Sequence, residues 1–277
     1  MDNVTKDQHF PRNPNYNDPG VLGGTWTNTV TGEIWECVGH YNINALKVMD
    51  AGYIWYLKDD NSSGSGGGAK EPYIEETYDT DGYLTSVVMH GYTKVPSYKF
   101  SNYGKLQTFF DYGTTIKSIE SGAFNGCTSL ALTYLPSGLT IISDYAFTNC
   151  TSLALTSLPD GITSIGQGAF DGCTSLALTS LPSGLTSIPN NVFLNCDGLV
   201  SMSIHSGINT INAAAFGKCG GLTSVTFEGK PSGNMAKNIF QGCINLTEIK
   251  VPWAEGSVAN APWGATNATI TYNYTGE

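Results

Sequence analysis

Charge is the scarcest property of this 277-residue chain. Asp, Glu, Lys and Arg together make up 13% of the residues, whereas soluble domains usually carry about 25%. The formal net charge is −10, and no basic surface is available to neutralise phosphates, so we exclude nucleic acid as a partner. Between residues 122 and 226 the only basic residue is Lys218. This middle part is therefore polar but almost uncharged.

Long apolar runs are also absent. No run of roughly 18 or more apolar residues occurs, so the sequence predicts no membrane-spanning helix and no membrane insertion. The amino-terminal stretch MDNVTKDQHFPRNPNYND lacks the apolar centre of a signal peptide. We therefore expect either that a signal was trimmed from the chain or that the protein leaves the cell by another route.

The sequence lacks the residue patterns of a catalytic or metal centre. No C-x2-C pair occurs, and the four histidines are scattered, which argues against zinc. The histidines have no nearby serine or cysteine nucleophile, so they form no triad. The stretch DTDG at residues 79–82 lacks the remainder of a calcium loop. We therefore expect no metal, no cofactor and no enzymatic activity.

An internal repeat is what the chain does contain. Six cysteines follow one another at steps of 23 or 24 residues: Cys127, Cys150, Cys173, Cys196, Cys219 and Cys243. Three residues before them stand Phe124, Phe147, Phe170, Phe193, Phe216 and Phe240. Three residues after them stand Leu130, Leu153, Leu176, Leu199, Leu222 and Leu246. Five residues before the phenylalanines stand Ile119, Ile142, Ile165, Ile188, Ile211 and Met235.

A period of this length indicates an array of stacked coils rather than a globule with one closed core. One coil of 23–24 residues cannot bury its own apolar residues, but stacked coils place each column on the same column of the next coil. An earlier, degenerate copy places Val95, Phe100, Tyr103 and Leu106 in the four positions, with tyrosine replacing cysteine. The sequence therefore predicts a β-rich solenoid of about seven coils.

The cysteine column invites a disulfide prediction, which the stacking argues against. Side chains that are in register in neighbouring coils point the same way, and this suits a bridge poorly. We expect the six cysteines to be free thiols that act as small, buried apolar fillers. The seventh, Cys37, stands outside the column.

The frame I-x4-F-x2-C-x2-L, followed by a Pro-Gly turn, resembles the BspA-type leucine-rich repeat, also called the Treponema pallidum type, over residues 95–251. The resemblance implies a right-handed solenoid with a short strand on one face of each coil. It also implies a bacterial surface or phage-borne protein that binds rather than catalyses.

The early copies depart from this frame. The family has apolar residues three, six and eight positions after the cysteine, as in Leu222, Val225 and Phe227. The early copies read LALTSLP, with a leucine at position five and a threonine at position six. Either the strand is bent there or a leucine is exposed, and the sequence leaves both alternatives open.

The two ends of the chain differ from the repeats. Residues 1–60 are expected to form a small β-rich domain, because GTWTNTVTGEIWECVG reads as two strands around a turn and AGYIWYLKDD as a third. Residues 61–70 have the composition of a Gly/Ser linker. Residues 71–94 predict a β-hairpin with a two-residue Asp81-Gly82 turn, which covers the open edge of the first coil.

Residues 252–277 are expected to cap the other end. There Trp253 and Trp263 would cover the last phenylalanine, and ATITYNY would add a final strand. This ending resembles the terminus of repeat proteins encoded by phages of gut bacteria, and the hairpin in residues 1–60 is similar to segments of phage tail fibres. The resemblances imply a location on a virion, with the bacterial cell surface as the alternative.

One position, seven residues after each cysteine, lies between apolar neighbours and is predicted to face outward. Its occupants are Tyr134, Ser157, Ser180, Ser203, Thr226 and Lys250. Stacked, they would form a ladder of hydroxyls with an aromatic ring at one end, which suits sugars or polar protein loops. The alternative is that Ser and Thr are merely tolerated on a solvated sheet.

The sequence thus predicts a non-enzymatic recognition protein. In the favoured interpretation it is a phage tail or receptor-binding component whose solenoid contacts a protein or glycan of the host cell surface, while residues 1–60 dock to tail proteins of the virion. The alternatives are a bacterial surface adhesin that binds host matrix or glycans, and a structural spacer.

Overall fold

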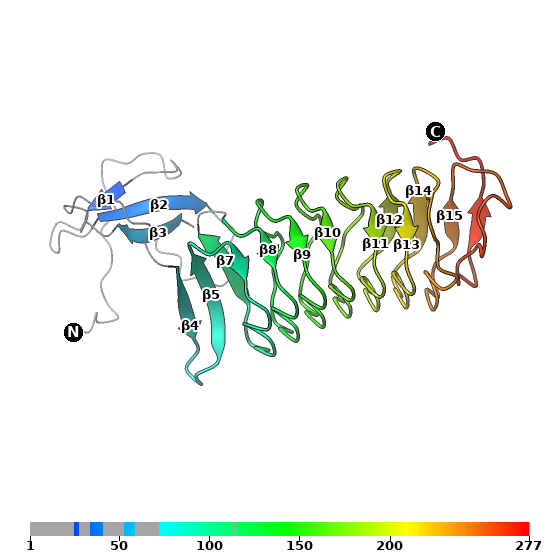
Figure 1. Ribbon diagram of the computed structural model, residues 1–277. Helices are drawn as coiled ribbons and strands as arrows, with labels where there is room; N and C mark the ends of the chain where they lie inside the picture. Colours follow the sequence, from blue (N-terminus) through cyan, green and yellow to red (C-terminus); the bar gives the residue numbers. More distant parts are fainter. Residues whose placement is uncertain (1–24, 28–33, 41–52, 59–71, 113–114, 277) are drawn as a thin grey trace. The chain divides into compact units, whose positions relative to one another are not determined.

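The computed structural model describes residues 25–27, 34–40, 53–58, 72–112 and 115–276 (Figure 1). The chain divides into two compact units, residues 1–69 and residues 70–277. The predicted linker of residues 61–70 and the amino-terminal stretch of residues 1–24 lie outside the described residues. Across the described ranges the backbone forms strands and turns without a helix, so no segment found there could cross a membrane as a helix.

The first unit contains one antiparallel sheet. Strand β1 (Thr25–Thr27) pairs with β2 (Ile34–His40), and β2 pairs with β3 (Tyr53–Lys58), in the order β1-β2-β3. These are the three strands predicted from the tryptophan-rich stretches. A β-bulge interrupts the second pairing between Cys37 and Gly39.

The second unit is a β-solenoid, which confirms the predicted fold. Each coil contributes a two-residue strand that ends on the apolar residue of the first column: β6 (Lys94–Val95), β8 (Ser118–Ile119), β9 (Ile141–Ile142), β10 (Ser164–Ile165), β11 (Ser187–Ile188) and β13 (Thr210–Ile211). These strands pair in parallel within two groups, β6-β8-β9-β10 and β11-β13. They form one side of the solenoid, which we call the isoleucine side.

A second row of strands follows the leucine column, which is the fourth column of the repeat. Four parallel strands pair in the order β12 (Ser201–Ile204), β14 (Ser224–Phe227), β15 (Glu248–Lys250) and β16 (Thr269–Thr271). We call this four-stranded sheet the late sheet, and the coils of residues 199–271 the late coils. Strand β16 confirms the final strand expected from ATITYNY.

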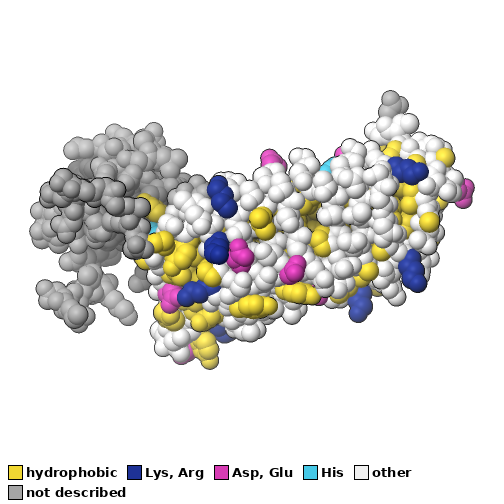
Figure 2. All heavy atoms as spheres, in the orientation of Figure 1, with side chains coloured by type: hydrophobic (Ala, Val, Ile, Leu, Met, Phe, Trp, Pro, Cys, Tyr) yellow, Lys and Arg dark blue, Asp and Glu magenta, His cyan; other side chains and the backbone are white. Residues whose placement is uncertain are grey.

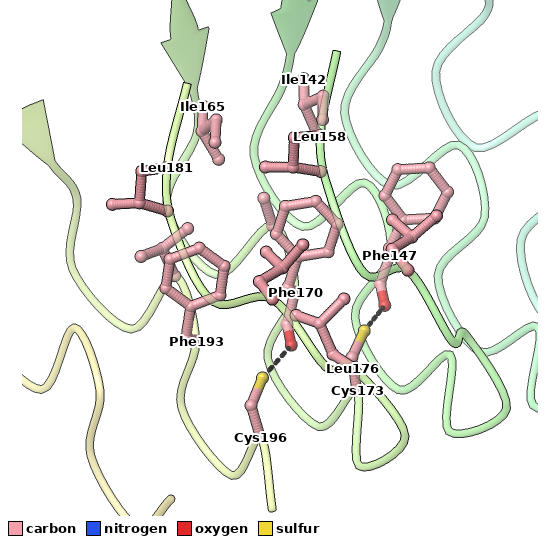
Figure 3. Packing of buried hydrophobic residues seen from close by; sticks show 14 of the residues in the cluster. Ile142, Phe147, Leu158, Ile165, Phe170, Cys173, Leu176, Leu181, Phe193 and Cys196 are labelled. Carbon is pink, nitrogen blue, oxygen red and sulfur yellow. Dashed lines mark hydrogen bonds between the residues drawn. The ribbon is translucent and has the colours of Figure 1, made fainter. Parts of the chain in front are cut away.

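The core is a stack of phenylalanine rings along the solenoid axis. Neighbouring ring centroids lie 5.3–5.8 Å apart, and all the rings are buried. The stack runs through Phe100, Phe124, Phe147, Phe170, Phe193, Phe216 and Phe240. Figure 3 shows three of these rings, with isoleucine and leucine columns packed beside them. Burial of each ring contributes about 1.5–3 kcal/mol, as does burial of each leucine or isoleucine in the neighbouring columns.

The column cysteines are buried and free, and they do more than fill space. Each thiol donates a hydrogen bond of 2.9–3.1 Å to the phenylalanine carbonyl of the preceding coil, as Cys173 does to Phe147 (Figure 3). Burial raises the pKa of the Cys127 thiol to about 12, and burial also raises the pKa of Cys150 and Cys196. These three thiols therefore stay protonated and keep donating. A hydrogen bond from the Cys219 side chain instead lowers the pKa of Cys243.

Tyr103 does not occupy the cysteine column, and that prediction is wrong. Val95, Phe100 and Leu106 of the same coil are buried as predicted, but Tyr103 is 45% exposed. The slot that holds a cysteine accepts a small side chain close to the carbonyl of the preceding coil, as Cys127 lies close to Phe100. A tyrosine ring is too large for that slot, so it turns out to solvent.

The amino-terminal end of the solenoid is covered by the expected hairpin. Strand β4 (Tyr73–Tyr78) pairs with β5 (Leu84–His90), and β5 pairs in parallel with β7 (Thr108–Tyr112) of the first coil. The predicted two-residue turn is wrong. The central residues of the turn are Thr80 and Asp81, because the Asp79 carbonyl accepts a hydrogen bond from the Gly82 N–H. Gly82 follows these two residues with a φ of 82°.

The carboxyl-terminal end is capped by the two tryptophans in a different way from the one predicted. The rings of Trp253 and Trp263 contact Phe227, at centroid distances of 5.3 and 5.7 Å, rather than the ring of the last phenylalanine in the stack. Phe240 instead donates its backbone N–H to the carbonyl of Trp263. Phe227 belongs to the late sheet, so the tryptophans cover the end of that side of the core.

The structure settles the register of the early copies, the coils of residues 116–185, which we call the early coils. Leu155 and Leu178 are buried, while Thr156 and Thr179 are exposed. For these two copies the bent strand is therefore correct, whereas Leu132, at position five of the first copy, is only partly buried. Backbone hydrogen bonds continue from coil to coil at this point, for example from Ala177 to the Leu155 carbonyl at 3.0 Å, but no strand like those of the late sheet forms.

A candidate binding face on the late coils

The predicted outward row forms a continuous ladder that begins at Ser180, in the last of the early coils, and runs through the late coils. Ser180 pairs with Ser203 across a parallel bridge, Ser203 with Thr226, and Thr226 with Lys250. The side chains face outward because their neighbours along the strands turn into the core. The buried neighbours are Met202, Ile204, Val225, Phe227, Ile249 and Val251.

Tyr134 and Ser157, the other two predicted members, stand apart from this ladder. Both are exposed, Tyr134 by 49%. They lie in the early coils, where the chain bends at Thr133 and Thr156 and burial has shifted to position five. The structure therefore brings four of the six predicted residues into one paired row.

Two parts of this face were not predicted from the sequence. Lys250 pairs with Thr271, which extends the row onto β16. A second outward row lies two residues earlier on the same strands: Ser201, Ser224, Glu248 and Thr269. The two-residue alternation of a strand was a usable signal for the second row. Thr271 was hidden because the last coil lacks the cysteine that sets the frame.

Polar contacts hold several of these side chains in place. The Ser203 hydroxyl donates to Glu228 Oε1 at 2.6 Å, and Lys250 Nζ lies 3.2 Å from Glu248 Oε2. Lys250 Nζ also lies 5.2 Å from the centroid of the Tyr274 ring. The charges at this end of the face are therefore paired, and the remainder of the two rows is made of neutral hydroxyls.

The chemistry of the face is that of binding. Hydroxyl groups both donate and accept hydrogen bonds, so they match neutral polar ligands. Within the described residues no group of three or more His, Cys, Asp or Glu side chains could hold a metal ion. Figure 2 shows that backbone and uncharged polar side chains, drawn in white, cover much of the described solenoid on the side in view, with few charged side chains.

Several solved structures are similar to this chain in fold. The T. pallidum leucine-rich repeat protein TpLRR is 24% identical, with a TM-score of 0.46, over 62% of this chain and 87% of its own. A leucine-rich repeat protein from Bacteroides ovatus ATCC 8483 is 18% identical, with a TM-score of 0.44, over 68% and 61%. A leucine rich cell surface protein from Faecalibacterium prausnitzii A2-165 is 23% identical, with a TM-score of 0.36, over 69% and 60%.

No curated protein matches the sequence significantly. The sequence pattern of the BspA type leucine rich repeat region does match, in 6 copies, over residues 93–223 and 140–260. Proteins with this type of repeat are typically cell-surface or extracellular, and they bind rather than catalyse. The matched residues exceed half of the chain and coincide with the stacked columns of isoleucine, phenylalanine, cysteine and leucine. The chain therefore belongs to the BspA-type leucine-rich repeat family.

Proposed function

We propose that the protein recognises a cell surface and that the late sheet makes the contact. The single observation that carries this proposal is the paired ladder Ser180–Ser203–Thr226–Lys250, continued by Thr271. A ladder of neutral hydroxyls on a regular sheet offers repeated hydrogen bonds at a fixed spacing. The partner is a protein or glycan exposed on a cell.

The scarcity of charge determines how such a contact would behave. A surface with little net charge does not attract a partner from a distance, so binding should depend weakly on salt. Single neutral hydrogen bonds contribute about 1 kcal/mol each. Affinity must therefore come from several coils acting together, or from many copies displayed on one particle.

A cell-binding assay tests the proposal. We expect the full chain, multimerised on beads, to bind cells from a panel of bacterial and epithelial types, whereas the monomer binds weakly. Changing Ser180, Ser203 and Thr226 together to arginine should remove binding without unfolding the protein. If residues 1–60 retain all the binding and this triple variant binds as well as the wild type, the solenoid is a spacer.

The protein could carry out this recognition in one of two places, on a bacterial surface or on a phage tail. A bacterial surface adhesin is supported by the typical location of the family. A phage tail component is supported by the fibre-like sequence of residues 1–60, whose β1-β2-β3 sheet belongs to a unit separate from the solenoid. In that setting the first unit would dock to tail proteins of the virion. Immunogold labelling of purified virions and of intact cells separates the two.

A further inference from the structure

A second surface of the solenoid carries two exposed tyrosines that stand two coils apart. In each coil a double turn connects the isoleucine side to the cysteine column, and we call this part of the surface the turn edge. Two residues before the phenylalanine, the turn edge carries Tyr98, Gly122, Tyr145 and Gly168 in successive coils. Tyr98 is 61% exposed and Tyr145 is 39% exposed. Figure 2 shows hydrophobic side chains gathered along the lower margin of the amino-terminal half of the solenoid.

The alternation of tyrosine and glycine has a steric cause. All four residues have positive φ values, between 55° and 63°. Each tyrosine ring lies against the glycine of the next coil, because a Cβ on Gly122 would stand 2.3 Å from Tyr98 Cε1 and one on Gly168 would stand 2.7 Å from Tyr145 Cδ1. The backbone conformation and these contacts hold the rings in place, so a ligand that packs on them costs little additional conformational entropy.

The spacing of the rings sets the repeat of a matching ligand. Neighbouring coils lie 5.4–5.5 Å apart in this part of the phenylalanine stack. Tyr98 and Tyr145 are two coils apart, so equivalent rings recur at twice this spacing. In an extended β-1,4-linked polysaccharide the length of one sugar unit is about equal to the spacing between neighbouring coils. Successive sugars are rotated by about half a turn around the chain axis. The same face of the sugar chain therefore returns at every second unit, in step with the tyrosines.

The groups around the rings fit the same ligand. Tyrosine combines an apolar ring, on which the C–H face of a sugar packs, with a hydroxyl that forms hydrogen bonds. The Tyr145 hydroxyl accepts from Gln167 Nε2 at 2.7 Å, which fixes its position. Asn102 and Asn149 stand four residues after the tyrosines and lie against Gly126 and Gly172 of the next coils. The exposed charged residues next to the two rings, Lys99 and Asp144, are of opposite sign, so the site carries little net charge and matches a neutral chain of hydroxylated rings.

We infer that the turn edge between Tyr98 and Gly168 is a binding site for a neutral, β-1,4-linked polysaccharide that runs along the solenoid axis. This inference rests on the recognition role proposed above. It names a ligand class for that role and adds a second contact surface, the turn edge, to the late sheet. A protein partner is the competing occupant, and the experiment below distinguishes it.

Isothermal titration of the full chain with cellohexaose, N-acetylchitohexaose and mannohexaose tests this site. We expect the wild type to bind at least one of the three and not to bind maltohexaose, whose α-linkages curl the chain. The double variant Y98N/Y145N should bind at least about tenfold more weakly. Asparagine already occupies this column at Asn191 with a φ of 56°, so the variant keeps the backbone conformation.

The matched control is Y134N, which removes an exposed tyrosine outside the turn edge and should leave oligosaccharide binding unchanged. If Y98N/Y145N loses its native circular dichroism spectrum, Y98G/Y145G replaces it, because glycine is the other residue that this column uses. The inference is overturned if none of the three oligosaccharides binds, if maltohexaose binds equally well, or if the double variant binds as the wild type does. Cell binding without oligosaccharide binding overturns this inference alone and favours a protein partner, whereas loss of both also removes the recognition role.

Discussion

The early and late coils share four buried columns, yet their strand sides differ. In the late coils Val225 and Ile249 stand six residues after the cysteine, and the chain forms the extended strands β14 and β15. In the early coils Leu155 and Leu178 are buried at position five, and the chain bends instead. The extended strands form only where the apolar residue stands at position six, although Ser180, in the coil with Leu178 at position five, still pairs with Ser203 through a single bridge.

The two regions also differ in what they expose. The late coils present hydroxyls in a regular ladder, whereas the turn edge of the early coils presents tyrosine rings. The phenylalanine stack runs through both without interruption. One core thus supports two surfaces of different chemistry, and the predictions below separate what the regions share from what distinguishes them.

The largest effect should come from the shared stack. Phe170 lies 5.5 Å from the ring of Phe147 and 5.7 Å from that of Phe193. Phe170→Ala leaves a cavity between two rings and should lower the free energy of unfolding by about 3–5 kcal/mol. Phe216→Ala, in the late coils, should cost about the same. Urea unfolding measures both, and a much smaller loss for one of the two would show that the coils do not share one core.

Alkaline pH should destabilise the protein through the cysteine column by a comparable amount. The folded pKa of Cys127 is raised from 9.0 to about 12, mainly by burial, so the folded state holds its proton more tightly than the unfolded state does. The stability that this provides is fully present below pH 9 and is lost as the pH rises toward 12. Each unit of pKa shift corresponds to about 1.4 kcal/mol.

Unfolding measured across this pH range checks the effect. Cys127→Ala is the matched control, because it removes the titrating group and should flatten part of the pH dependence. An unchanged pH dependence in that variant would contradict a role for this thiol.

Substitution of a glycine at the turn edge should have the next largest effect on stability. Gly122→Ala places a side chain at a φ of 63° and against the Tyr98 ring. We expect the free energy of unfolding to fall by about 1–3 kcal/mol. The double variant Y98G/G122A should recover part of this loss, because it removes the clash with the ring but not the backbone strain. Ala214→Gly is the control: this residue already has a φ of 50° in the same column, so glycine should relieve strain. Equal losses in the single and double variants would show that the ring contact is irrelevant.

Exchanging leucine and threonine between positions five and six should convert early coils toward the late type. The combined variant L155T/T156L/L178T/T179L places leucine at position six in two neighbouring coils, as in the late frame. We expect the ladder to extend from Ser180 to Ser157, with amide exchange in these coils slowed by about tenfold. Hydrogen exchange followed by mass spectrometry measures this, and unchanged exchange in a folded variant would show that the bend has another cause.

The buried columns were predictable because each occurs in six copies with one spacing. The register of the early coils was not, because LALTSLP offers a leucine at position five and a threonine at position six, and only packing against neighbouring coils decides between them. Tyr103 was misplaced because the spacing fixed its position in the frame while its size excluded it from the thiol slot.

The candidate faces were predictable only in part. The outward row followed from strand alternation in the late copies, but its extension to Thr271 did not, since the last coil lacks the cysteine. The thiol donors were also missed, because the sequence indicates that the cysteines are buried and gives no sign of the phenylalanine carbonyls beside them. The Tyr–Gly alternation was visible in the sequence, but its meaning depends on the positive φ values.

A paired comparison of cell binding tests the central claim, that the paired ladder of the late coils makes the recognition contact. Two full-length variants are compared with the wild type as bead-bound multimers on the same cells: S203R/T226R in the ladder, and Y134R/S157R at the corresponding positions outside it. We predict that the first loses binding by at least about tenfold and that the second retains it, with both variants folded. Retained binding in the first and lost binding in the second would contradict the account.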